Sequence, residues 1–147
     1  MSRERIEEMG PVDYVVLAWP DRQPKGDVAP MILDLVDRGI IRILDIAFIV
    51  KDADGEVAGV EVDALEDDAG RFREFHGASS GLLGDDDLQD AAAALEPGTS
   101  AAVLVWENRW AAPIAVALRR SGGELVATGR VPIQAIVASL DAAEAVA

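Results

Sequence analysis

The chemistry open to this chain is limited by its residue types. Its 147 residues include one histidine, His76, and no cysteine, which excludes disulfides, thiolate metal sites and cysteine nucleophiles. A general base at His76 would need an orienting carboxylate and a nearby nucleophile. Ser79 and Ser80 follow closely, but no nucleophile-elbow pattern surrounds them. We therefore expect a structural or exposed histidine, in a glycine-rich segment that is the best place in the chain for a ligand lid.

Catalysis by this chain would have to use carboxylates. The candidates are Asp13, Asp45, Glu61 and Glu107, and no clustered catalytic motif joins them. Asp45 lies inside a strongly apolar run, where we expect a buried arginine such as Arg42, or a backbone amide, as its partner. The sequence therefore predicts a protein that is not an enzyme, with no catalytic residues and no cofactor.

Three consecutive carboxylates, Asp85, Asp86 and Asp87, are the weak candidates for a metal site. They stand at the expected start of a helix, where carboxylates cap the first turn and complement the positive end of the helix dipole. We favour the capping role and expect no metal.

The cluster Glu107-Asn108-Arg109-Trp110 is the most unusual combination of polar and aromatic side chains. It stands at a predicted strand-to-helix junction, where sites often form in α/β folds. In the functional interpretation, Glu107, Arg109 and Trp110 contact a ligand or partner, as does His76. In the structural interpretation, Trp110 packs in the core, Asn108 caps the helix and Arg109 pairs with Glu107.

Acidic residues dominate the chain, with 27 Asp and Glu against 13 Lys and Arg and a formal net charge of −14. Binding to nucleic acid or to an anionic membrane is not expected, because phosphate binding needs local positive charge. No run of about 18 apolar residues is present to span a membrane, and the N-terminus lacks the apolar stretch of a signal peptide. We expect a cytoplasmic protein.

Hydrophobic periodicity predicts the elements that would position these residues. Strands are expected at 12–19, 40–50, 57–63, 101–106 and 124–130, and helices at 28–36, 85–95, 110–118 and 132–143. Asp54-Gly55 marks a hairpin turn before the strand at 57–63. Residues 61–90 carry ten acidic residues and two arginines, and we expect an irregular excursion within them.

Two stretches share the same order of motifs. Val15–Trp19 and Ala102–Trp106 are each followed by an Ala-Pro that opens an apolar helix, then by glycine and a strand. Two such βαβ units predict an α+β fold, a ferredoxin-like sandwich with both helices on one face of the sheet. We expect a single domain over 1–147, with halves at about 10–63 and 98–147. An acidic segment, 64–97, would join them, and the hairpin strand at 57–63 and the acidic helix at 85–95 would be the insertion between the halves.

Several stretches carry a family resemblance: Gly10–Tyr14, Leu35–Asp45, Lys51–Gly55, Leu95–Ala102 and Glu107–Ala111. Together they resemble a family of small uncharacterised bacterial proteins, mostly from high-GC Gram-positive organisms, classed as a domain of unknown function. The chain is also similar to a second unknown family, in which a glycine-zipper membrane segment precedes the acidic helix. Only 76–84 stands in that place here, so no membrane role is carried over. The resemblance implies at most a cytosolic accessory or stress-associated role.

Two functions from different classes remain open. The strands are apolar on both faces, so the sheet face without helices needs a cover. Another copy of the chain could supply it, which predicts a homo-oligomer that associates through its sheet or edge strands, or the helix at 132–143 could. The alternative is a small-ligand sensor with a pocket under segment 64–84.

Overall fold

The computed structural model describes residues 7–21, 24–61, 72, 75 and 77–146. The chain divides into two compact units, Met1–Ala117 and Leu118–Ala147. The sheet and its two packed helices lie in the first unit. Within the described residues, every helix is too short or too polar to cross a bilayer.

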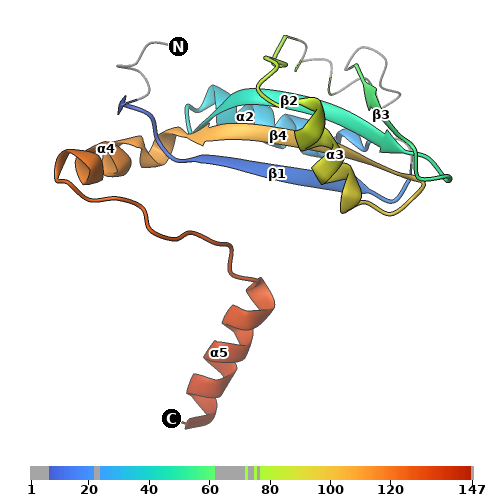
Figure 1. The fold of residues 1–147 in the computed structure, drawn as a ribbon. Coiled ribbons are helices and arrows are strands. Elements are labelled where there is room, and N and C mark those ends of the chain that lie inside the picture. Colours follow the sequence, from blue (N-terminus) through green and yellow to red (C-terminus); the bar gives the residue numbers. More distant parts are fainter. Residues whose placement is uncertain (1–6, 22–23, 62–71, 73–74, 76, 147) are drawn as a thin grey trace. The chain divides into compact units, whose positions relative to one another are not determined.

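The first unit contains a four-stranded antiparallel sheet (Figure 1). Its strands are β1 (Val12–Trp19), β2 (Ile41–Lys51), β3 (Val57–Val60) and β4 (Thr99–Asn108). The strands expected at 12–19, 40–50 and 101–106 are confirmed, and β4 is longer at both ends. The hairpin turn is confirmed too, since the Gly55 N–H donates to the Asp52 carbonyl (3.0 Å) and Gly55 has a φ of 88°.

The strand order is β1-β4-β2-β3. Since β4 is antiparallel to both of its neighbours, β1 and β2 run parallel to each other without touching. They form a split βαβ unit with α2 (Ala29–Asp37). By the same reasoning β3 and β4 are parallel, separated by β2 and joined through α3 (Asp85–Ala93). The second split unit is therefore β3-α3-β4, a different set of elements from the predicted half at 98–147.

The prediction of a strand at 124–130 is wrong, because these residues have no regular secondary structure. The predicted duplication depended on that strand. The fold is α+β, but the ferredoxin-like arrangement of two matching halves is not confirmed.

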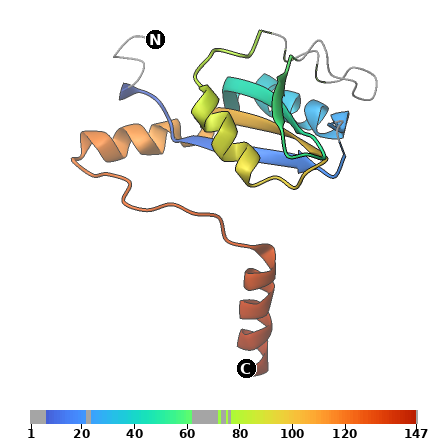
Figure 2. The same cartoon turned by 45° about the vertical axis from the view of Figure 1, so that its right-hand side comes forward.

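Helices α2 and α3 cover opposite faces of the sheet (Figure 2), which corrects the expectation that both lie on one face. The alternation of β4 explains why. Ala102 and Leu104 belong to the core under α2, and Ala101 and Val103 belong to the core under α3. Successive side chains of a strand point to opposite faces, so an apolar run on a central strand supplies two cores.

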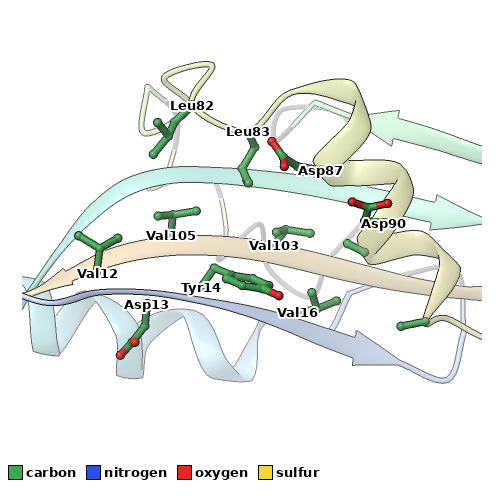
Figure 3. A pocket seen from close by; sticks show the side chains of 12 residues that line it. Val12, Asp13, Tyr14, Val16, Leu82, Leu83, Asp87, Asp90, Val103 and Val105 are labelled. Carbon is green, nitrogen blue, oxygen red and sulfur yellow. The ribbon is translucent and has the colours of Figure 1, made fainter. Parts of the chain in front are cut away.

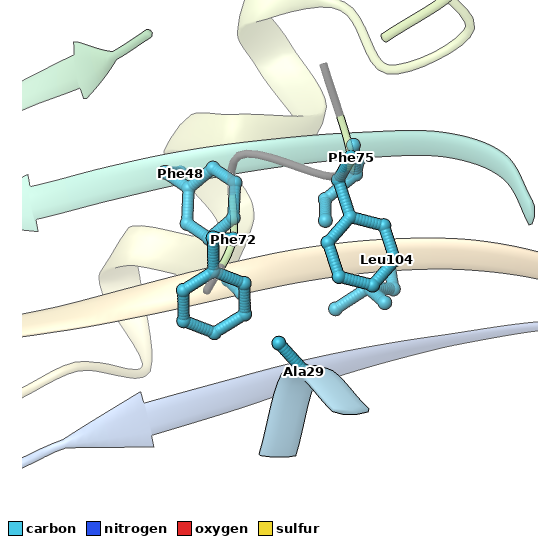
Figure 4. Packing of buried hydrophobic residues seen from close by; sticks show 7 residues of the cluster. Ala29, Phe48, Phe72, Phe75 and Leu104 are labelled. Carbon is cyan, nitrogen blue, oxygen red and sulfur yellow. The ribbon is translucent and has the colours of Figure 1, made fainter. Parts of the chain in front are cut away.

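The core under α2 contains three phenylalanines (Figure 4). Phe72 packs edge-on against Phe48, with ring centroids 5.0 Å apart, and contacts Trp19 and Phe75. Aromatic pairs of this kind contribute about 0.5–1.5 kcal/mol each beyond area burial. Phe72 and Phe75 come from the segment predicted to be an irregular excursion, so part of that segment is core.

The segment that follows passes from one face of the sheet to the other. Ala78 packs with the core under α2, whereas Leu83 packs with the core under α3. The passage lies along β2 where β3 has ended, since β3 pairs only with Phe48–Lys51. There the Ser80 hydroxyl donates to the Leu44 carbonyl (2.7 Å), beside a register shift between Ile43 and Asp45.

Helix α4 (Ala112–Arg120) follows a short 3-10 turn, η4 (Arg109–Ala111). These elements confirm the helix expected at 110–118, and their large apolar side chains Trp110, Ile114 and Leu118 are exposed. In the second unit, α5 (Ile133–Val146) confirms the helix expected at 132–143. Its large apolar side chains are exposed, and no described residue of its own unit covers them.

Candidate functional site

An apolar groove lies on the α3 face of the sheet in the first unit (Figure 3). Its volume is about 490 Å³, within the range of small-molecule sites. Side chains of β1 and β4 make the floor, α3 makes one wall, and the residues before α3 make one end. The lining residues are Val12, Asp13, Tyr14, Val16, Leu82, Leu83, Asp87, Asp90, Ala91, Ala94, Val103 and Val105.

The groove exists because one short helix cannot cover this face. Helix α3 has nine residues and so spans about 13 Å, whereas the ten residues of β4 span about 33 Å. Val103 lies under the helix, and Val105 lies beyond the part that α3 covers most closely. Tyr14, on the neighbouring edge strand, is 72% exposed.

The charged groups that line the groove, as far as the chain is described, are carboxylates. Asp87 and Asp90 stand on α3 above the floor (Figure 3). One oxygen of Asp87, Oδ2, accepts a hydrogen bond from the Gly84 N–H (2.9 Å). The Asp13 carboxylate points to the other face of the sheet, where it accepts from Asn108 Nδ2 (2.8 Å). Of the residues that the structure describes, no lysine, arginine or histidine lines the groove.

Asp45 is buried beside the groove, with 2% of its surface exposed. Its Oδ1 accepts from the N–H groups of Ile46 (2.9 Å) and Ser80 (2.8 Å), and its Oδ2 accepts from the N–H of Leu83 (2.7 Å). The expected backbone-amide partner is confirmed and the alternative, Arg42, is not its partner. These bonds fasten the crossing segment, and so the Leu82-Leu83 end of the groove, to β2.

Glu107 lies at a second, smaller hollow of about 280 Å³, lined by Glu8, Met9, Arg42, Glu107 and Arg109. Glu107 accepts from Arg42 Nε (2.9 Å) and from the Gly10 N–H (2.9 Å). The predicted pairing of Glu107 with Arg109 is therefore wrong, although both residues line the same hollow. Gly10 is required there, since a Cβ atom would lie 2.3 Å from the Asn108 carbonyl oxygen.

Asn108 connects tryptophans rather than capping a helix. Its Oδ1 accepts from the indole N–H groups of Trp106 (3.2 Å) and Trp110 (3.3 Å), and its side chain makes no capping bond. Trp110 is 61% exposed, so the expectation that it packs in the core is wrong. Arg109 and Trp110 thus stay available as contact residues, but they lie outside the apolar groove.

The remaining predicted site residues have simpler positions. His76 lies outside the described residues. Asp85, Asp86 and Asp87 form the first turn of α3, where Asp87 bonds back to the residue before the helix. Across the described part of the chain, no group of three or more histidine, cysteine, aspartate or glutamate side chains is placed to hold a metal ion.

Sequence reasoning missed the groove-lining residues Tyr14, Asp90 and Val105. The residue types gave a weak indication of a groove, because β1 and β4 are apolar on both faces. The groove itself depends on how far α3 extends over the sheet, and no short sequence pattern predicts that extent.

The model of one protein family, described as a family of unknown function (DUF6325), matches residues 8–146. No curated protein and no solved structure matches the chain.

Proposed function

Because the chain belongs to the DUF6325 family of unknown function, its role must be argued from its surfaces, and we propose that it is a non-catalytic interaction domain that associates with a second copy through the free edge of β1. The observation that carries this proposal is an eight-residue strand at the end of the sheet. Among the described strands, β1 has β4 on one side and no neighbour on the other.

The sequence of β1 supports this proposal because the strand lacks the usual protection of an edge. Natural edge strands carry lysine, proline or a bulge that prevents pairing with another chain. Between Val12 and Trp19, Asp13 is the one charged residue, there is no proline, and the register with β4 is continuous. A strand of this kind can pair with its own copy.

The side chains near this edge add to the argument. Tyr14 and Val12 are exposed on the groove face. A two-fold axis would pair β1 with its copy in antiparallel orientation. That pairing would join two four-stranded sheets and cover part of this apolar surface.

A charge substitution on β1 tests the proposal. We expect wild-type protein at micromolar concentration to have about twice the 15.6 kDa mass of one chain, measured by size exclusion with light scattering. Tyr14→Lys should weaken the dimer by at least about tenfold, because like charges would face each other across the paired strands.

The matched control is Met31→Lys on α2. Met31 is 70% exposed, nearly as much as Tyr14, and belongs to α2, which covers the sheet face opposite to the groove. This variant should keep the wild-type mass. A monomeric wild type, or equal loss in the two variants, would contradict the proposal.

A second candidate function, the binding of a small ligand, is favoured by the apolar groove. A pocket under segment 64–84 was the sequence-based form of this idea. The groove takes Leu82 and Leu83 from that segment and the rest of its lining from β1, β4 and α3. Ligand binding predicts that small apolar probes shift the methyl resonances of Val103 and Val105.

A further inference from the structure

We propose that the groove between α3 and the outer strands binds a small amphipathic organic cation, an aryl or alkyl amine with an apolar body and a protonated head. This inference rests on the ligand-binding candidate above and names the chemical class of that ligand. It combines three features of the groove: an apolar floor, a carboxylate rim and an exposed aromatic ring.

The floor fits an apolar body. Val16, Val103 and Val105 present methyl groups from neighbouring strands (Figure 3). Ala91 and Ala94, whose side chains are small, also line the groove. Apolar surface placed on these residues leaves water, which supplies the non-directional part of binding. The volume of about 490 Å³ accommodates a small molecule.

The rim selects the charge of the head group. Asp87 and Asp90 are three residues apart on α3, a spacing that places both on one side of a helix. Asp87 uses Oδ2 for Gly84, and among the described residues no hydrogen bond or ion pair engages the Asp90 carboxylate. Two carboxylates above an apolar surface, with no basic residue among the described lining residues, attract a cation and repel an anion.

The ring of Tyr14 also favours a cationic head group. Its ring is 72% exposed and lines the groove. An ammonium group held over an aromatic face is attracted by the electron density of the ring.

The chain's own uncovered helix is a poorer occupant. Helix α5 carries Asp141 and Glu144 and no basic residue, so an α5 helix from a second copy would bring like charge to the carboxylate rim. A fatty acid would do the same. An amphipathic amine matches both the apolar floor and the acidic rim.

Three probes that share one apolar body test this inference. Full-length protein is titrated with 4-phenylbutylamine, 4-phenylbutanol and 5-phenylpentanoate while NMR follows the methyl groups of Val103, Val105 and Ala91. We expect the amine to bind at least about tenfold more tightly than the acid, with the alcohol between them. Added salt should weaken binding of the amine, because salt screens exposed charges.

Asp90→Asn is the matching variant, and it should reduce amine affinity by about threefold or more, toward that of the alcohol, while leaving alcohol affinity unchanged. Asp54→Asn is the control. Asp54 lies in the exposed hairpin turn, so this variant changes the net charge equally without touching the groove, and amine affinity should not change.

The outcomes separate this inference from the function on which it rests. If none of the probes shifts the groove methyl groups, the ligand-binding function itself fails. If the acid or the alcohol binds as tightly as the amine, a ligand site exists but the cation preference is overturned. If the groove resonances respond to protein concentration and not to probe, a second copy is the occupant, which also overturns the inference.

Discussion

At the scale of single residues, the carboxylate of Asp45 joins two parts of the chain that are distant in sequence. It accepts three backbone hydrogen bonds, two of them from Ser80 and Leu83. A buried carboxylate is stable only when its oxygens are satisfied in this way. Asp45 is therefore a positioning residue for the end of the groove, although its place in an apolar strand first suggested chemistry.

Asp45→Asn should lower the free energy of unfolding by about 1–3 kcal/mol, because an amide NH₂ would replace one acceptor and face a buried N–H donor. Chemical denaturation measures the change. Asp52→Asn is the control, since the Asp54 and Glu56 N–H groups both bond to the same oxygen, Asp52 Oδ1, and the amide keeps that oxygen. A loss of stability as large in the control would contradict this explanation.

The hydrogen-bond partners of polar residues could be predicted only where the partners are close in sequence. The Asp52 turn was identified because its signal lies within five residues. The bond from Arg42 to Glu107 joins residues on two strands that are 65 positions apart, so the nearer Arg109 was the natural guess. The hydrogen bonds of Asn108 to Trp106 and Trp110 were missed although each tryptophan is two positions away, because their geometry depends on how the chain turns at the end of β4.

At the scale of elements, α3 is held to the sheet at its C-terminal end by a lysine from β2. Lys51 Nζ donates to the carbonyls of Ala92 (3.1 Å) and Leu95 (3.0 Å). The helix has three aspartates in its first turn and no basic residue in its last turn. Lys51 thus supplies the positive charge that the C-terminal end of a helix dipole favours.

Lys51→Met should keep the apolar stem and remove both hydrogen bonds, which costs about 1–2 kcal/mol. Hydrogen exchange should show weaker protection of the α3 amides, while α2 stays unchanged. Lys25→Met is the control, because Lys25 makes only an exposed ion pair with Asp21 at 3.8 Å. Equal protection of α3 in the wild type and in Lys51→Met would show that packing alone holds the helix.

Elements were predicted better than their arrangement. Periodicity located β1, β2, α2 and α3 because each pattern lies within its own segment. The strand at 124–130 was also predicted from its own local pattern, yet these residues have no regular secondary structure, and β2 already has both neighbours, β4 and β3. The face of the sheet that each helix covers could not be predicted from the sequence of one segment either. A strand that is apolar on both faces can pack against a helix on either face.

At the scale of the whole molecule, the sheet is assembled from segments far apart in the sequence. β4, the last strand, lies between β1 and β2, and it pairs Val12 with Glu107 and Lys51 with Thr99. The hairpin of β2 and β3 is the local part of the sheet. Long loops must close before the other pairs form, and such topologies fold slowly.

Dividing the chain before β4 tests this dependence. A fragment of residues 1–97 should lack a stable sheet by circular dichroism and should regain strand signal when mixed with a fragment of residues 98–147. Residues 1–117 contain all four strands and should fold without the second unit. A folded 1–97 fragment would contradict the role assigned to β4.

The central position of β4 also has a consequence for biosynthesis. While the nascent chain is still on the ribosome, β1 and β2 have emerged without the strand that separates them. Their apolar edges stay open to other chains until residues 99–108 have left the exit tunnel. The edges of β1 and β2 are therefore exposed for a time that depends on translation speed. Slower translation of the segment before Thr99 would lengthen that time.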